Sequence, residues 1–324
     1  MPNTFDMNAH FKACVDIGGT KVAVSLAGGD TPQQLRWRRS EPTAKSGRND
    51  AVAQQIIRML GDACAEGQLG LDAIGSVGVS ACGPFVMRDG LVELAAPNIC
   101  GGLAGPARGL PNDWQSATLE APLRARLPGV RVENDCVAAL EAERRWGALQ
   151  GVDHCAYVTW STGIGMGVCV DGHILRGKGG NAGHGGHMFV NDDVSDALCG
   201  CGNRGDVEAL VAGNAIARRF GGEGGWAGAA ELLQQARADD APAVAVVDEL
   251  CRVLGRALYN VVVLLDIERI ALGGSVFWHH RDFLLPRLQA HITGHLPALT
   301  DGVLLVPAGL GDKVGDYAAL ALAA

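Results

Sequence analysis

A short segment near the start of the chain combines one carboxylate with a turn of small residues. Asp16 ends an apolar run, Gly18, Gly19 and Thr20 follow, and Lys21 opens a second apolar run. This pattern is typical of a hairpin whose tip leaves backbone N–H groups and the Thr20 hydroxyl free to approach an anion. Asp16 would hold Mg²⁺ or its water beside that anion. An ordinary Gly-Gly hairpin with a solvated aspartate explains this segment equally well.

A second segment of the same kind lies roughly half a chain further on. It runs from Tyr157 to Val170, with a turn at Thr162 and Gly163 and a further glycine at Gly165. Two phosphate-type hairpins predict two similar half-folds that face each other across a cleft. A Rossmann fold is disfavoured, because these glycines alternate as in a strand and no helix follows them.

Candidate catalytic and ligand-binding residues follow two predicted strands. Asn134 and Asp135 lie between a strand over 130–133 and a helix over 136–146. Catalytic groups are commonly exposed at such a junction. Asp135 could instead only cap the helix, and this segment alone favours capping. The two phosphate-type turns on either side of it in the chain add weight to catalysis. Gly83 follows the strand over 74–80 and is either a ligand contact or part of a plain turn.

Four possible metal ligands stand close together. His187, Cys199, Cys201 and Asp206 supply one imidazole, two thiolates and one carboxylate, all of which tetrahedral Zn²⁺ accepts. His184 is a rival to His187, and a reduced pair of loop thiols is the alternative to a metal. A structural zinc is the favoured interpretation, although aspartate is the least usual of these ligands.

The elements that position these residues are predicted from hydrophobic periodicity and turn signals. Helices are expected over 50–66, 242–265 and 315–323, and buried strands over 74–80, 269–272 and 304–307. Gly273 and Gly274 follow the strand over 269–272, where bare backbone would let a planar ring lie against it. The Gly/Pro-rich loop over 101–113 is long enough to be functional or mobile.

Composition sets bounds on the class of protein. The chain has 324 residues, 48% hydrophobic and 19% charged, with a formal charge of −8, which favours a soluble protein of two domains. The acidic balance disfavours nucleic acid and anionic membranes as partners. We expect no leader in the polar residues 1–11 and no run that spans a bilayer. Cysteines scattered singly through apolar segments favour reduced thiols in a cytoplasmic protein.

Two domains are expected, without a clear linker between them. The first is predicted over 1–116 and the second over 117–312, with a C-terminal helix at about 313–324 that packs back on the first.

Taken together, these segments resemble the ROK family (repressors, open reading frames, kinases) within the actin-like ATPase superfamily. Residues 16–21 look like its first phosphate motif, 133–135 like the segment with the catalytic aspartate, and 161–165 like its second phosphate motif. Residues 271–274 are similar to its adenosine motif. Gly186 and His187, then eleven residues and the segment 199–205, resemble its zinc motif.

The resemblance implies an α/β fold of two lobes, each with a mixed five-stranded sheet, and ATP in the cleft between them. It implies transfer of the γ-phosphoryl group to the C6 hydroxyl of a hexose, with Asp135 as general base, and ATP, Mg²⁺ and structural Zn²⁺ as cofactors. Homodimers are common in the family. The expected sugar contacts are Gly83, Asn98, Asn134, Asp135, His184, His187 and Glu208. The expected nucleotide contacts are Asp16, Gly18, Gly19, Thr20, Lys21, Thr162, Gly163, Gly165, Gly273 and Gly274.

Three departures from the family pattern leave the sugar open. His184 replaces a glutamate that contacts the sugar near C1 and C2, Asp206 replaces the third zinc cysteine, and the segment 100–114 is longer than usual. Glucose is slightly favoured as the commonest family substrate, and an N-acylhexosamine such as N-acetylmannosamine is the alternative. A sugar-binding regulator without kinase activity is the alternative from another class. A DNA-binding repressor is disfavoured, because only thirteen residues precede Cys14.

Overall fold

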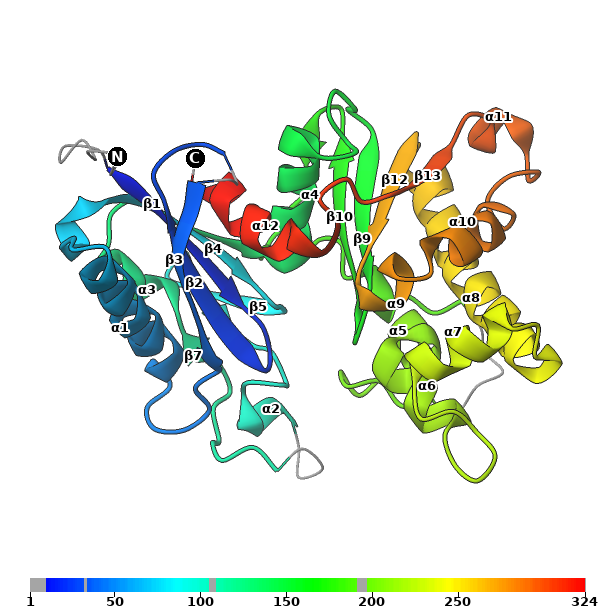
Figure 1. Cartoon of the computed structure of the whole chain (residues 1–324), viewed down its shortest axis with the longest axis horizontal. Coiled ribbons are helices and arrows are strands. Elements are labelled where there is room, and N and C mark those ends of the chain that lie inside the picture. The colour runs from blue at the N-terminus through cyan, green and yellow to red at the C-terminus, as the bar shows by residue number, and fades with distance from the viewer. Residues whose placement is uncertain (1–9, 32–33, 105–108, 191–196, 324) are drawn as a thin grey trace. The chain divides into compact units, whose positions relative to one another are not determined.

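The chain crosses four times between two sets of packed elements, after Ala142, Arg176, Asn181 and Asp312. The computed structural model describes residues 10–31, 34–104, 109–190 and 197–323. Unit 1 contains the described residues up to Ala142, residues 177–181 and those from 313 onward, and unit 2 contains the rest. Figure 1 labels elements of both units where there is room.

The elements of unit 1 are β1 (Phe11–Ile17), β2 (Lys21–Ala27), β3 (Leu35–Pro42), α1 (Ala51–Glu66), the 3₁₀ helix η2 (Leu71–Ala73), β4 (Ile74–Ala81), β5 (Phe85–Arg88), β6 (Leu91–Leu94), α2 (Gly101–Ala104), β7 (Ala117–Thr118), α3 (Glu120–Arg124), β8 (Val130–Asn134) and α12 (Val314–Leu322). Helix α4 (Asp135–Trp146) begins in unit 1 and ends in unit 2, and η5 (Gly311–Lys313) lies at the last crossing.

The elements of unit 2 are β9 (Cys155–Trp160), β10 (Ile164–Val170), β11 (His173–Ile174), η4 (Gly185–His187), α5 (Val207–Val211), α6 (Gly213–Phe220), α7 (Ala229–Arg237), α8 (Ala241–Leu265), β12 (Arg269–Gly273), α9 (Ser275–Trp278), α10 (Arg281–Gln289), α11 (Pro297–Thr300) and β13 (Leu304–Pro307).

The two units contain sheets of the same topology. The strand order is β3-β2-β1-β4-β8 in unit 1 and β11-β10-β9-β12-β13 in unit 2. In each, the first three strands are antiparallel neighbours, and the remaining two pair in parallel. The expectation of two similar half-folds, each with a mixed five-stranded sheet, is therefore confirmed.

Alternating side chains of the unit 1 sheet bury its two faces under different helices. Val15 of β1 and Val79 of β4 join one core with Ile56 of α1. On the opposite face α12 lies against β1 and β4 (Figure 1). This contact is close, since a Cβ atom on Gly78 would lie 2.0 Å from the carbonyl oxygen of Ala319.

The division between the units differs from the boundary expected near residue 116. Unit 1 continues to Ala142, because β8 completes its sheet beside β4. Local patterning could not indicate this, since the pairing of β8 joins segments far apart in sequence. The three-stranded sheet β5-β6-β7 was not foreseen either. Within the described residues, no helix is long and apolar enough to cross a membrane.

Candidate functional site

The candidate residues of unit 1 meet at one edge of its sheet. Ile17 of β1 pairs with Ala81 of β4, and Ala81 pairs with Asn134 of β8. All three strands are parallel, so their carboxyl ends lie side by side. Asp16 directly precedes Ile17, and Asp135 directly follows Asn134. The structure thus gathers the two aspartates where open α/β sheets commonly hold ligands.

The charges at this edge interact. Burial, and then the negative charges of Asp135 and Asp316, raise the pKa of Asp16 to about 6. Burial followed by Asp135 and Asp16 also raises the pKa of the Cys82 thiol. Lys21 acts in the opposite direction on Asp16. A site that disfavours its own negative charge in this way is suited to bind a cation.

The first glycine turn is held from both sides. The Gly18 N–H donates to the Lys21 carbonyl oxygen at 2.9 Å, and the Thr43 hydroxyl donates to the Gly18 carbonyl oxygen at 2.7 Å. Thr20 and Lys21 are exposed at the turn. A Cβ atom on Gly19 would lie 2.0 Å from Nδ2 of Asn98, so the Asn98 amide occupies the space above this glycine.

Asn98 brings an unused acceptor to the same turn. Its Oδ1 atom is buried and has no hydrogen-bond partner among the residues that the structure describes. A buried acceptor without a partner costs free energy, and a ligand hydroxyl could satisfy it. The sequence resemblance singled out this asparagine, and its contact with Gly19 depends on the fold.

Asp135 lies at the candidate site and is the first residue of α4, so Asn134 occupies the N-cap position. The N–H of Cys136 donates to Oδ1 of Asn134 at 3.0 Å, as in a cap, and to Oδ1 of Asp135 at 2.8 Å. The interpretation of Asp135 as only a helix cap is therefore not supported, because Asn134 holds that position. The cis peptide bond between Gly83 and Pro84 follows β4, two residues past Ala81.

The second glycine turn, in unit 2, is braced by Glu208. Its Oε2 atom accepts the N–H of Ile164 at 3.0 Å, and a Cβ on Gly163 would lie 2.6 Å from that oxygen. Thr162 is exposed at the tip, whereas Gly165 lies within β10 opposite Thr159. Glu208, expected as a sugar contact, thus also holds this turn in place.

Packing accounts for the glycine pair at the end of β12. A Cβ atom on Gly273 would lie 2.6 Å from the hydroxyl of Tyr157. Gly274 has a φ of +91°, and its Cβ would lie 2.4 Å from the carbonyl oxygen of Trp160. Both positions therefore require glycine for packing within unit 2, independently of any ring bound there.

Four side chains of unit 2 form one group that could bind a metal. The ligand atoms of His187, Cys199, Cys201 and Asp206 all lie within 4.8 Å of one another. His187 Nδ1 is 3.2 Å from Asp206 Oδ2 and 3.6 Å from Cys199 Sγ, and Cys201 Sγ is 3.5 Å from Asp206 Oδ2. Tetrahedral zinc with its usual bond lengths separates its ligands by roughly 3.3–3.8 Å, so the donor set fits.

Asp206 serves a second purpose in this group. Its Oδ1 atom accepts the N–H of Ala209 at 2.8 Å and so caps α5, the helix that carries Glu208. Burial opposes its ionisation, yet hydrogen bonds from His187 and the Ala209 N–H lower its pKa. The same bond to Asp206 raises the pKa of His187.

His184 lies beside the metal group but outside it. Its ring stacks on that of His187, with the centroids 6.1 Å apart and the planes inclined by 28°. The four-ligand group contains His187, so the rival assignment of His184 as a ligand is not supported by the geometry.

Asp316 was not identified from the sequence. It lies in the first turn of α12, where Arg38 Nε donates to its Oδ1 at 3.0 Å, and its charge acts on Asp16. No local signal marks it, because α12 is otherwise an apolar helix and only its packing on β1 brings the two carboxylates near each other.

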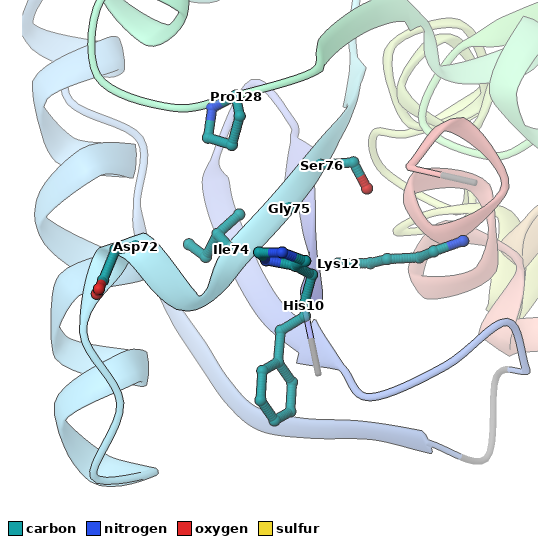
Figure 2. Close-up of a pocket in the computed structure, with 8 residues that line it drawn as sticks. His10, Lys12, Asp72, Ile74, Gly75, Ser76 and Pro128 are labelled. Carbon is teal, nitrogen blue, oxygen red and sulfur yellow. The ribbon is translucent and has the colours of Figure 1, made fainter. Parts of the chain in front are cut away.

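A cavity of about 460 Å³ lies elsewhere in unit 1 and has a different lining. Figure 2 shows it at the amino ends of β1 and β4, with a lining that includes His10, Lys12, Ile74, Gly75 and Ser76. None of the residues that line it belongs to the motifs described above. The candidate site is at the opposite, carboxyl ends of the same strands.

Comparisons with known proteins agree on one family. The chain matches the model of the ROK family over residues 12–324. It is similar to a glucokinase of Aeropyrum pernix, 29% identical over 330 residues and covering 95% of each chain. It is also similar to an N-acetylmannosamine kinase of Escherichia coli, 34% identical over 263 residues, which cover 81% of this chain and 82% of that enzyme.

A solved structure gives the same result for the fold. The chain is similar to a ROK family glucokinase from Streptomyces griseus in complex with glucose and AMPPNP, with a TM-score of 0.69 and 26% identity. The alignment covers 97% of this chain and 99% of that one. The expected actin-like ATPase fold is confirmed.

Proposed function

The chain belongs to the ROK family, and on that premise we propose that it is an ATP-dependent hexose kinase. It transfers the γ-phosphoryl group of ATP to the C6 hydroxyl of a hexose. The observation that carries this proposal is the placement of Asp135 beside Asp16 at the carboxyl ends of β8 and β1. One carboxylate there can accept a proton while the other holds a cation.

Asp135 is the general base of the proposed reaction. An alcohol is a weak nucleophile, and phosphoryl transfer needs chiefly positioning, charge neutralisation and a proton acceptor. Asp135 would take the proton of the C6 hydroxyl while the hydroxyl oxygen bonds to the γ-phosphorus and the bond between that phosphorus and ADP breaks. General-base assistance of this kind contributes about 10²–10⁴-fold to the rate.

We assign the phosphates of ATP to the two glycine turns. Gly19 and Thr20 present backbone and hydroxyl donors in the turn that Gly18 closes through its bond to Lys21, and Thr162 and Gly163 present the equivalent group in unit 2. Lys21 and Gly165 are assigned to the same substrate, Gly273 and Gly274 to its adenosine, and Asp16 to Mg²⁺. When bound, Mg²⁺ would neutralise charge on the phosphates.

Glucose is the favoured sugar and N-acetylmannosamine the second candidate. The relative that covers 95% of the chain is named a glucokinase, whereas the one that is 34% identical is named an N-acetylmannosamine kinase. Asn98, Asn134, His187 and Glu208 are assigned to the sugar, with Gly83 at the same edge as Asp135. His184 leaves the choice between these sugars open, because an imidazole donates or accepts a hydrogen bond where the family's carboxylate only accepts one.

A sugar screen tests the kinase proposal. The purified protein is incubated with ATP, Mg²⁺ and single sugars, including glucose, mannose, N-acetylglucosamine and N-acetylmannosamine, while ADP release is followed. We expect one sugar to stimulate ADP release at least roughly tenfold, and the product to carry phosphate at C6 by nuclear magnetic resonance. If no sugar stimulates ADP release, the protein is not the proposed kinase.

We further propose a structural zinc ion, a homodimer and a cytoplasmic location. His187, Cys199, Cys201 and Asp206 would hold the zinc, which would keep the loop before α5 in one conformation. The described cysteines form no disulfide with one another, which supports a reducing compartment. The dimer rests on the family alone, and sedimentation analysis of the purified protein tests it.

A further inference from the structure

Glu143 is a carboxylate without solvent exposure that the proposed mechanism does not use. It lies in α4, eight residues after Asp135. Its Oε2 atom accepts the N–H groups of Ala148 at 2.7 Å and Gly309 at 2.8 Å, and its Oε1 atom accepts the N–H of Leu310 at 2.9 Å. One side chain therefore joins two backbone segments that are far apart in sequence.

These segments approach each other as closely as backbone allows. A Cβ atom on Gly147 would lie 2.1 Å from Oε2 of Glu143, and one on Gly309 would lie 2.6 Å from the nitrogen of Ala148. The carbonyl oxygen of Glu143 also accepts the N–H groups of Gly147 at 3.0 Å and Leu149 at 3.2 Å. Glycine at 147 and 309 is thus what permits the carboxylate to reach all three donors.

The joined segments adjoin two of the four crossings between the units. Helix α4 starts at Asp135 in unit 1 and enters unit 2 at Glu143 itself. Leu310 lies two residues before the last crossing, after which the chain continues as α12 in unit 1. Asp316 of α12 is one of the charges that act on Asp16. Glu143 therefore links the helix that carries the proposed base to the segment that leads to α12.

We propose that Glu143 is a positioning residue for the phosphoryl transfer. By holding residues 148 and 309–310 together, it fixes the C-terminal end of α4, the helix whose first residue is the proposed base, Asp135. This inference rests on the proposed kinase function. A small displacement of a reacting group lowers the rate of a reaction strongly while leaving binding of the ground state largely intact.

Glutamine at this position is a sharp perturbation, because it has nearly the same shape as glutamate. Oε2 accepts two of the three bonds and Oε1 accepts one. An amide presents N–H groups in place of one oxygen, so at least one backbone donor then faces another donor. The Leu310 bond is lost in the better of the two orientations. The matched control is Glu141→Gln on the same helix, where the carboxylate binds the half-buried Arg131 at 2.6 and 2.9 Å.

The first measurement is amide hydrogen exchange in the full chain without ligands. We expect the N–H of Leu310 to exchange at least roughly tenfold faster in Glu143→Gln than in wild type, because it loses its buried acceptor, whereas the N–H groups of Ala148 and Gly309 keep the glutamine oxygen. Glu141→Gln should leave the exchange of Leu310 unchanged. Equal exchange in wild type and Glu143→Gln would show that the carboxylate does not fix these segments, and would overturn the proposal without reference to kinase activity.

The second measurement separates positioning from stability. At a temperature where circular dichroism shows the variants to be folded, kcat of Glu143→Gln should fall at least roughly tenfold, with the sugar Kd from calorimetry within about threefold of wild type. A purely structural role lowers the melting temperature and leaves kcat unchanged, and that result overturns the proposal. If Glu143→Gln does not fold, Glu143→Asp is judged by the same criteria. Wild type that phosphorylates no sugar refutes the kinase proposal instead, and hydrogen exchange still decides the role of Glu143.

Discussion

Replacing Gly19 by alanine tests whether the first glycine turn holds Asn98 in place for the sugar. The added Cβ would lie 2.0 Å from Nδ2 and 2.5 Å from Cγ of Asn98, distances that real Cβ atoms do not adopt. The obstacle is the end of a flexible side chain, so the Asn98 amide should turn away while the turn itself stays folded. Its unpaired Oδ1 would then no longer be available to a sugar hydroxyl.

The expected loss follows from one neutral hydrogen bond. Such a bond contributes about 0.5–1.5 kcal/mol net, which corresponds to a roughly 2- to 12-fold weaker sugar Kd by titration calorimetry without nucleotide. Gly18→Ala is the matched control, because its Cβ would meet only the Lys21 carbonyl oxygen, at an ordinary 3.4 Å. The control should leave the sugar Kd unchanged.

A double-mutant cycle decides whether the effect passes through Asn98. In an Asn98→Ala background the amide is gone and only the Cβ of residue 98 remains, 3.1 Å from the added Cβ, so Gly19→Ala should weaken sugar binding no further. If Gly19→Ala weakens binding as much in that background as in wild type, the assignment of Asn98 as a sugar ligand held by this turn is wrong.

Three further perturbations probe the charge, the metal group and the packing. Asp16→Asn should lower kcat yet raise the melting temperature, and the rise should be larger at about pH 7.5 than at about pH 5. The fold raises the pKa of Asp16 to about 6, so wild type loses stability as the pH rises from the ordinary pKa of an aspartate toward 6. An equal shift of the melting temperature at both pH values in calorimetry contradicts this. Elemental analysis should find nearly one zinc per chain in wild type and in the core variant Cys64→Ala and clearly less in Cys199→Ser, and metal-free fresh wild type rejects the site. Gly274→Ala should lower the melting temperature more than Gly47→Ala, because both have a φ near +90° but only Gly274 also faces a backbone oxygen at 2.4 Å; equal losses would refute the packing argument.

The residues of the candidate site could be singled out from the sequence because each lies in a short segment with a recognisable pattern, although neither the first glycine turn nor the Asp135 segment was decisive alone. Asp16 follows an apolar run and precedes a glycine turn, and Asp135 stands between a strand and a helix. The metal group was predictable too, because its four ligands lie within one stretch of chain. In each case the neighbouring residues in the sequence indicate both the turn or helix start and the functional group that it carries.

What the sequence could not show depends on pairing between distant segments. Asp316 and Glu143 look like ordinary acidic residues of helices. Only the fold brings Asp316 near Asp16 and places Glu143 against the N–H groups of Gly309 and Leu310. The sequence could not show for the same reason that unit 1 continues to Ala142, since β8 joins its sheet through parallel pairing with β4.

The role of Asp135 as general base is tested most directly by Asp135→Asn. Asparagine can still accept the N–H of Cys136, and Asn134 at the N-cap position is unchanged, so the variant should fold. With the sugar identified by the screen, kcat is measured by ADP release and the sugar Kd by calorimetry. The proposed mechanism predicts that kcat falls by about 10²–10⁴-fold while the Kd stays within about threefold. A kcat equal to that of wild type would contradict it.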